Sequence, residues 1–277
     1  MGSRAGQSFE IQLEQDRIVR GDWYTAESQP SKGTLIICHG YKGFKDWGMF
    51  PYSAQSLAKD VDVVAINFSH NGVGADLLTF SELEKFAKAT YSRDLEDLEA
   101  VVNYIYQRDK IASKQPILLL GHSRGAAVCL IYALDHPAQI AGVISWNGIA
   151  NVDLFTEENK AEMRETGRAY TLNGRTKQNM PLDLEILVDM ERNQERLDII
   201  SRISGIACPV SLVQGTEDGE RGIKGSTQLV QQNPAIKWLR IPAGNHTFGS
   251  VHPFQGETAP MKEAIRVTLE SIREMLG

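Results

Sequence analysis

The chain has 277 residues, of which 42% are hydrophobic and 23% charged, a composition ordinary for a soluble globular protein with a substantial core. The formal net charge is −6, and no long basic run occurs, which argues against nucleic acid or an anionic membrane as the main partner. No stretch approaches the roughly 18 apolar residues of a membrane span, and residues 1–11 lack the apolar centre of a secretory signal. Cys38, Cys129 and Cys208 lie in apolar segments, which predicts buried reduced thiols and a cytoplasmic protein.

Apolar and polar residues alternate over residues 9–20 and 22–27, which predicts an antiparallel strand pair at one sheet edge. Further along, short apolar runs alternate with segments of helical periodicity, so we expect a mostly parallel sheet of about eight strands flanked by helices. The expected strands are residues 34–38, 61–68, 117–120, 140–146, 209–214 and 236–241, and the expected helices are residues 52–58, 92–107, 126–132, 226–231 and 260–276.

Residues 152–204 interrupt this alternation. They form polar, charged stretches of helical character, broken by Gly167, Gly174 and Pro181. A segment of this length is too long for a simple connection between two elements. We therefore expect one α/β domain over residues 1–277, with a small helical cap inserted at about residues 152–204.

The segment 121–125 reads Gly-His-Ser-Arg-Gly and joins a buried apolar strand to an apolar helix. Such a turn places Ser123 at its tip in a strained backbone conformation, and Gly121 and Gly125 let neighbouring chain pass closely. The start of the helix also offers free N–H groups beside the hydroxyl. The pattern predicts a nucleophilic serine, although the pentapeptide alone also fits an ordinary tight turn.

A serine hydroxyl needs a base to remove its proton and a partner to orient that base. Functional groups of an open α/β sheet gather at the carboxyl ends of its strands. Asp218 and His246 follow the last two predicted strands, which predicts that Asp218 orients His246 as the base for Ser123. The open alternatives are Glu217 as the acid, a turn role for Asp218, and His252 or His70 as the base.

An oxyanion needs two N–H donors. One is predicted to be the backbone N–H of Arg124, and the other the backbone N–H of Tyr41, in the turn that follows the strand 34–38. The alternative interpretation of this turn is an ordinary loop without a role in catalysis. No metal-binding spacing or phosphate-binding glycine pattern occurs, so we expect no metal and no cofactor. The residues expected to line a substrate pocket are Trp47, His70, Trp146, Phe155 and Phe248.

The order of His39-Gly40, Ser123, Asp218 and His246 resembles the α/β-hydrolase superfamily across nearly the whole chain. The segments 39–43, 67–72 and 245–248 and the short cap are similar to the bacterial feruloyl (cinnamoyl) esterase-like branch. That resemblance implies an α/β-hydrolase fold and a serine carboxylesterase acting on a small-molecule ester with a short or aromatic acyl group. Such esterases more often carry an uncharged residue where this chain has Arg124, whose side chain either points away or contacts an acidic substrate.

Two other functions are compatible with the same residues. An acyltransferase or peptidase would use the same triad, and a non-catalytic protein would bind small molecules on a hydrolase scaffold. The natural substrate and the oligomeric state stay open at this point.

Overall fold

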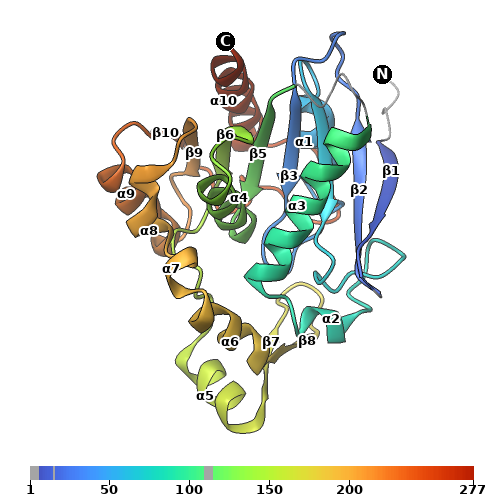
Figure 1. Ribbon diagram of the computed structural model, residues 1–277, viewed down its shortest axis with the longest axis vertical. Helices are drawn as coiled ribbons and strands as arrows, with labels where there is room; N and C mark the ends of the chain where they lie inside the picture. Colours follow the sequence, from blue (N-terminus) through green and yellow to red (C-terminus); the bar gives the residue numbers. More distant parts are fainter. Residues whose placement is uncertain (1–5, 15, 109–114) are drawn as a thin grey trace.

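The main sheet of the computed structural model has eight strands, and the structure describes residues 6–14, 16–108 and 115–277. Residues 1–5, part of the N-terminal stretch without a signal-like centre, lie outside the described residues. The strands are β1 (Gln7–Gln12), β2 (Ile18–Tyr24), β3 (Thr34–Cys38), β4 (Asp62–Asn67), β5 (Ile117–His122), β6 (Ile140–Trp146), β9 (Val210–Gly215) and β10 (Lys237–Ile241). Their order is β1-β2-β4-β3-β5-β6-β9-β10 (Figure 1).

The pairing of these strands confirms the predicted mostly parallel sheet. β1 pairs antiparallel with β2, and β2 pairs antiparallel with β4, so the two antiparallel strands lie at one edge. The remaining neighbours, from β4 to β10, are all parallel. β3 and β5 are buried along their whole length because they lie mid-sheet and helices cover both faces, which explains their continuous apolar sequences.

Helices pack on both faces of the sheet (Figure 1). α1 (Phe50–Leu57) and α10 (Ala259–Leu276) contact each other on one face. α3 (Tyr91–Arg108), α4 (Arg124–Asp135) and α9 (Glu220–Gln232) cover the other. None of the helices in the described parts of the chain is long and apolar enough to cross a membrane.

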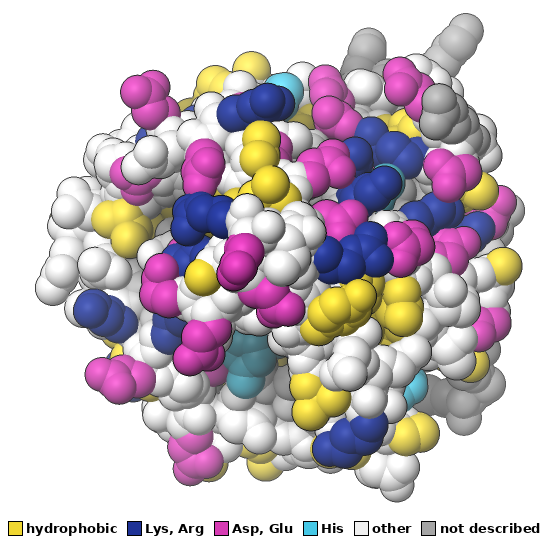
Figure 2. Space-filling model, turned by 90° about the horizontal axis from the view of Figure 1, so that it is seen from below, with side chains coloured by type: hydrophobic (Ala, Val, Ile, Leu, Met, Phe, Trp, Pro, Cys, Tyr) yellow, Lys and Arg dark blue, Asp and Glu magenta, His cyan; other side chains and the backbone are white. Residues whose placement is uncertain are grey.

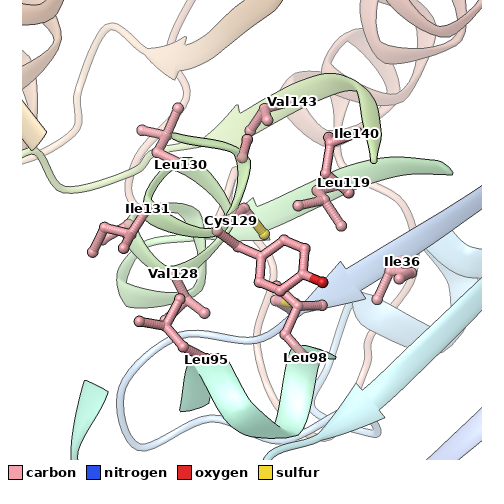
Figure 3. Packing of buried hydrophobic residues seen from close by; sticks show 14 of the residues in the cluster. Ile36, Leu95, Leu98, Leu119, Val128, Cys129, Leu130, Ile131, Ile140 and Val143 are labelled. Atoms are coloured by element: carbon pink, nitrogen blue, oxygen red, sulfur yellow. The ribbon is translucent and has the colours of Figure 1, made fainter. Parts of the chain in front are cut away.

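The core on the α3 and α4 side is built from the apolar stripes that the sequence predicts. Leu95 and Leu98 of α3 meet Val128 of α4 and Leu119 of β5 (Figure 3). All four side chains are at most 3% exposed. This packing holds the start of α4 against the ends of β3 and β5.

The three cysteines are free, as predicted, but they differ in burial. Cys38 and Cys129 are buried in the core between the sheet and α4, and the neighbouring Cys129 thiol, together with burial, raises the pKa of Cys38. Cys208 is partly exposed, which differs from the predicted burial. It precedes Pro209 at the entry to β9 rather than lying inside the sheet.

The insertion between β6 and β9 contains a β-hairpin as well as helices, which corrects the predicted small helical cap. Pro181 lies within β8 of this hairpin. Proline has no N–H to donate, and it is tolerated here because both strands of a two-stranded sheet are edge strands. Gly167 ends the helix before the hairpin with a φ of 86°. The elements are α5 (Glu157–Thr166), β7 (Arg168–Leu172), β8 (Asn179–Asp183), α6 (Leu184–Arg192), α7 (Gln194–Leu197), α8 (Ile199–Arg202) and a 3₁₀ turn (Ile203–Gly205).

The hairpin lies against the loops that follow β3 and β4. The backbone N–H of Asp183 donates to the carbonyl of Ala87, just after α2 (Leu83–Phe86), and the Gln178 side chain donates to the carbonyl of Phe80. α5, α6 and the hairpin lie at one end of the sheet, at the bottom of Figure 1. The insertion therefore stands over the carboxyl ends of these strands.

Candidate active site

Ser123 occupies the strained turn that the sequence predicts. Its φ of 54° and ψ of −116° lie outside the regions that non-glycine residues favour. A Cβ atom on Gly121 would lie 2.3 Å from the backbone nitrogen of Ala126, and one on Gly125 would lie 2.3 Å from the carbonyl oxygen of Cys38. Only glycine lets α4 leave β5 at this angle, and the resulting turn has the geometry of a nucleophile elbow.

Asp218 and His246 meet beyond the ends of β9 and β10. The distance from His246 Nδ1 to Asp218 Oδ1 is 2.8 Å, and the same oxygen accepts a bond of 2.8 Å from the N–H of Gly219. The other carboxylate oxygen accepts from the amide of Gln214. Because a carboxylate only accepts, Nδ1 carries the proton and Nε2 is left as a base. The Asp218 side chain is 2% exposed, whereas that of His246 is 49% exposed.

Asn147 holds the loop that carries His246, and Gln214 is bonded to both Asn147 and Asp218. The sequence analysis did not identify these two residues. The Asn147 amide donates to the carbonyls of Asn245 and His246 at 3.1 and 3.0 Å. Its oxygen accepts from the N–H of Gly215 at 2.8 Å and from Gln214 at 3.3 Å. The sequence feature that could have identified them is their position at the carboxyl ends of the predicted strands, Asn147 after β6 and Gln214 in β9. Their polar side chains are buried, so they fix the site rather than contact solvent.

The neighbour of Ser123 links the elbow to the His246 loop. His122 Nε2 donates to the carbonyl of His246 at 2.8 Å, and the two imidazole rings are 5.0 Å apart. Burial lowers the pKa of His122 to about 3, so its ring is neutral. The Ser123 hydroxyl has no hydrogen-bond partner within residues 6–14, 16–108 and 115–277. Bonds between nucleophile and base are often long before substrate binds and tighten later.

The turn after β3 packs directly on the elbow. A Cβ atom on Gly40 would lie 3.0 Å from that of Ser123. His39 shapes this turn: its Nε2 accepts from the N–H of Phe68 at 3.3 Å, so its Nδ1 donates to the carbonyl of Gly40 at 2.9 Å. Burial lowers the pKa of His39 to about 4, which keeps this neutral form. The backbone N–H group of Tyr41 has no acceptor in the described chain, so it is free to bind an oxyanion.

Arg124 starts α4, and its backbone N–H also has no acceptor among the described residues. Its side chain turns inward and is buried. Nε and Nη2 donate to Asp94 Oδ2 at 3.0 and 2.8 Å, and Nη2 also donates to the carbonyl of Ala89. The guanidinium lies 4.1 Å from the ring centre of Tyr91. The sequence left open whether the Arg124 side chain points away or contacts an acidic substrate. In the structure it points away from solvent and forms an internal ion pair with Asp94.

Two of the predicted pocket residues lie in the core instead. Trp146 and Phe248 are 0% exposed, and their ring centres are 5.5 Å apart. The Trp146 indole N–H donates to Thr268 on α10. The expectation that they contact substrate is corrected, because both rings are buried in the core cluster that also contains Met261 and Ala264 of α10.

The other three predicted pocket residues lie at or near the turn after β3 (residues 39–43), which we call the oxyanion turn after the role predicted for Tyr41. His70 and Tyr41 line the same small cavity. The Phe155 ring is 6.3 Å from that of Tyr41. Trp47 is 5% exposed and stacks between His252 and Arg175 rather than facing open space.

The alternative triad residues are placed elsewhere. Glu217 is exposed and makes no hydrogen bond or ion pair with His246, whose ring is bonded to Asp218 instead. His252 accepts from the N–H of Gly48 at 3.0 Å. His70 is bonded to Ser69, and burial lowers its pKa to about 4. Within the described ranges, no cluster of three or more histidine, cysteine or acidic side chains is arranged to hold a metal ion.

The inserted hairpin is bonded to the oxyanion turn. The Lys42 ammonium donates to Thr171 at 3.0 Å and to the carbonyl of Leu172 at 2.9 Å. In return, Arg175 donates to the carbonyl of Lys42 at 2.8 Å while its guanidinium lies 4.6 Å from the Trp47 ring centre. Lys42 has a φ of 56°, so these contacts hold a strained residue next to Tyr41.

We expect replacement of Arg175 by methionine to lower kcat about tenfold, because the turn that carries the Tyr41 N–H loses its anchor and removal of a whole oxyanion donor costs about 10²- to 10³-fold. Steady-state hydrolysis of a p-nitrophenyl ester would measure this. Arg164→Met, on the exposed face of α5, is the matched control. An unchanged kcat in Arg175→Met would show that the hairpin does not position the turn.

The face of the molecule that carries the insertion mixes charges of both signs with scattered hydrophobic side chains (Figure 2). A histidine side chain is visible in a hollow on this face. Tyr170 and Leu172 of β7 are more than half exposed. The surface around the site is therefore neither strongly acidic nor strongly basic.

A mostly parallel eight-stranded sheet, a strained serine between β5 and α4, and an aspartate–histidine pair after the last two strands define the α/β-hydrolase fold. A family model for this fold matches residues 33–166. The chain has the α/β-hydrolase fold, and the resemblance predicted from the sequence is confirmed at the level of the fold.

Solved structures of similar proteins cover almost the entire chain. Est1E from Butyrivibrio proteoclasticus, solved with ferulic acid bound, is 18% identical, with a TM-score of 0.72 over 97% of this chain and 99% of that one. A soluble variant of monoglyceride lipase from Saccharomyces cerevisiae, with a substrate analogue, is 14% identical, with a TM-score of 0.73 over 99% and 98%. Mouse alpha/beta hydrolase domain-containing protein 10 is 17% identical, with a TM-score of 0.69 over 97% and 99%. A search of curated proteins finds no matching sequence.

Proposed function

We propose that the protein is a serine hydrolase that cleaves carboxylic esters through an acyl-enzyme. The observation that carries this proposal is the strained Ser123, whose neighbour His122 is bonded to the carbonyl of His246, together with the bond between the half-exposed His246 ring and the buried Asp218. The ferulic acid bound to Est1E and the lipase among the similar structures support an ester as the substrate.

The reaction follows from the positions of these groups. Ser123 Oγ attacks the ester carbonyl carbon while His246 Nε2 takes its proton. The carbonyl oxygen becomes an oxyanion and binds the N–H groups of Tyr41 and Arg124. When the tetrahedral intermediate collapses, the C–O bond to the alcohol breaks, and His246 donates the proton to the leaving oxygen. Water then attacks the acyl-enzyme by the same steps and releases the acid and free Ser123.

The surroundings favour a small-molecule substrate with a short or aromatic acyl group. The oxyanion turn is flanked by aromatic rings: Phe86 is 5.5 Å and Phe155 is 6.3 Å from the Tyr41 ring. Such rings suit a planar or compact apolar group. The three free cysteines support a reducing compartment such as the cytoplasm.

Covalent labelling tests the proposal. The protein is treated with a fluorophosphonate while turnover of p-nitrophenyl butyrate is followed, and the labelled peptide is identified by mass spectrometry. We expect one adduct, on Ser123, that forms in step with the loss of turnover. Turnover without labelling of Ser123 would point to another nucleophile, and the absence of both would favour a binding protein on a hydrolase scaffold.

A further inference from the structure

A small cavity lies beside the oxyanion turn. Gly40, Tyr41, Arg124 and its partner Asp94 are among the residues that line it. Its volume is about 20 Å³, which is room for about one water molecule. Because the residues proposed to hold the ester carbonyl oxygen also line this cavity, it lies next to the acyl part of a bound ester.

Among the residues that line this cavity, Tyr41 and Arg124 each carry a donor that has no partner among the described residues. The Tyr41 hydroxyl is buried without a hydrogen bond, and burial raises its pKa, so it stays protonated and can donate. Arg124 uses Nε and Nη2 for Asp94 and Ala89, and its Nη1 has no acceptor in the described chain. A buried donor without an acceptor, as the Tyr41 hydroxyl is, is costly. The cavity therefore offers donors that an oxygen of a ligand would satisfy.

The charge at the cavity favours an uncharged oxygen. The Arg124 guanidinium is already neutralised by Asp94 at 2.8 Å, and both side chains are buried. A ligand carboxylate would lie beside the Asp94 carboxylate and would lose its hydration without gaining an unpaired cation. The ammonium of Lys42, which also lines the cavity, is already bonded to Thr171 and Leu172.

We propose that this cavity is an acyl subsite that selects acyl groups carrying an uncharged hydrogen-bond-accepting oxygen, such as a ketone, a few carbons from the ester carbonyl. Arg124 Nη1 and the Tyr41 hydroxyl donate to that oxygen and act as specificity-determining residues. The proposal rests on the proposed esterase function and deepens it by naming a substrate class.

Three p-nitrophenyl esters with the same branched skeleton test the proposal. They carry 4-oxopentanoyl, 4-methylpentanoyl and 3-carboxypropanoyl groups, which place a ketone, a methyl branch or a carboxylate at the same carbon. We expect kcat/KM for the ketone to exceed that for the methyl analogue by about tenfold or more, the discrimination typical of a hydrogen bond from a charged donor. Comparison of this ratio between variants cancels the intrinsic reactivity of each ester.

The Arg124→Met/Asp94→Asn double variant removes the donor without leaving an unpaired buried charge, and we expect its ketone-to-methyl ratio to fall to about one. Tyr41→Phe removes a hydroxyl that has no partner, so it should fold normally and lower the ratio several-fold. Arg202→Met/Asp135→Asn removes an ion pair at the far end of α4 and should leave the ratio unchanged. Thermal melting would check the folding of each variant.

A wild-type ratio near one, a preference for the carboxylate, or a ratio unchanged in both the double variant and Tyr41→Phe would overturn the proposal. If the double variant does not fold, Tyr41→Phe alone decides. Failure of the esterase function itself looks different: none of the three esters is hydrolysed, or hydrolysis survives Ser123→Ala.

Discussion

Replacement of Ser123 by alanine is expected to lower kcat for p-nitrophenyl butyrate by about 10⁵- to 10⁶-fold. Alanine removes the oxygen that would form the acyl bond, and the Asp218–His246 pair then has nothing to activate. The Cβ atom stays, so the packing of Gly40 on the elbow should not change. Steady-state kinetics, with circular dichroism to check the fold, would measure the effect.

The matched control is Ser250→Ala. Ser250 lies on the loop after His246, is 5% exposed, and its hydroxyl has no hydrogen-bond partner among the described residues. We expect it to keep close to wild-type activity. Activity that persists at the wild-type level in Ser123→Ala would refute the acyl-enzyme mechanism.

Replacement of Asp218 by asparagine is expected to lower kcat about 10³- to 10⁴-fold with little change in KM, the scale seen for the equivalent change in a serine protease. Both oxygens of this buried carboxylate accept N–H bonds, one from His246 and Gly219 and the other from Gln214. Asparagine has only one acceptor oxygen, so its NH₂ group must face one of these donors. Facing His246, it would favour the wrong imidazole tautomer.

Glu217→Gln separates the two acids that the sequence left open. Glu217 is exposed and lies next to Asp218 in the chain. Glu217→Gln therefore replaces a carboxylate by an amide, as Asp218→Asn does, at the neighbouring position. We expect kcat within about twofold of wild type, because an exposed side chain without a bond to His246 does not orient it. A large loss in Glu217→Gln together with normal activity in Asp218→Asn would reverse the assignment.

The sheet could be predicted because the sequence of most of its strands identifies them as strands. Residues 140–146 were predicted and are observed as β6, and most other strand limits differ by a residue or two. Buried parallel strands carry continuous apolar runs, so local sequence reveals them directly. The hairpin of β7 and β8 was missed because each strand has only five residues and Pro181 argued against a strand.

The candidate site could be predicted only where chain order carries the information. Ser123 stands between a strand and a helix, and Asp218 and His246 follow strand ends, so topology brings them to one edge. Asn147 and Gln214 have no such motif, and their role depends on hydrogen bonds to chain that is distant in sequence. Residues near strand ends can point to either side of the sheet, which is why Trp146 was misplaced.

The sequence by itself determined the order of strands and helices and the elbow at Ser123, because hydrophobic periodicity and glycine sterics act over neighbouring residues. Only the tertiary structure decided which way the Arg124 side chain turns: towards Asp94, on a helix 30 residues earlier in the chain. The physical reason is that burial of a guanidinium requires a counter-charge, and which partner supplies it depends on how α3 and α4 pack.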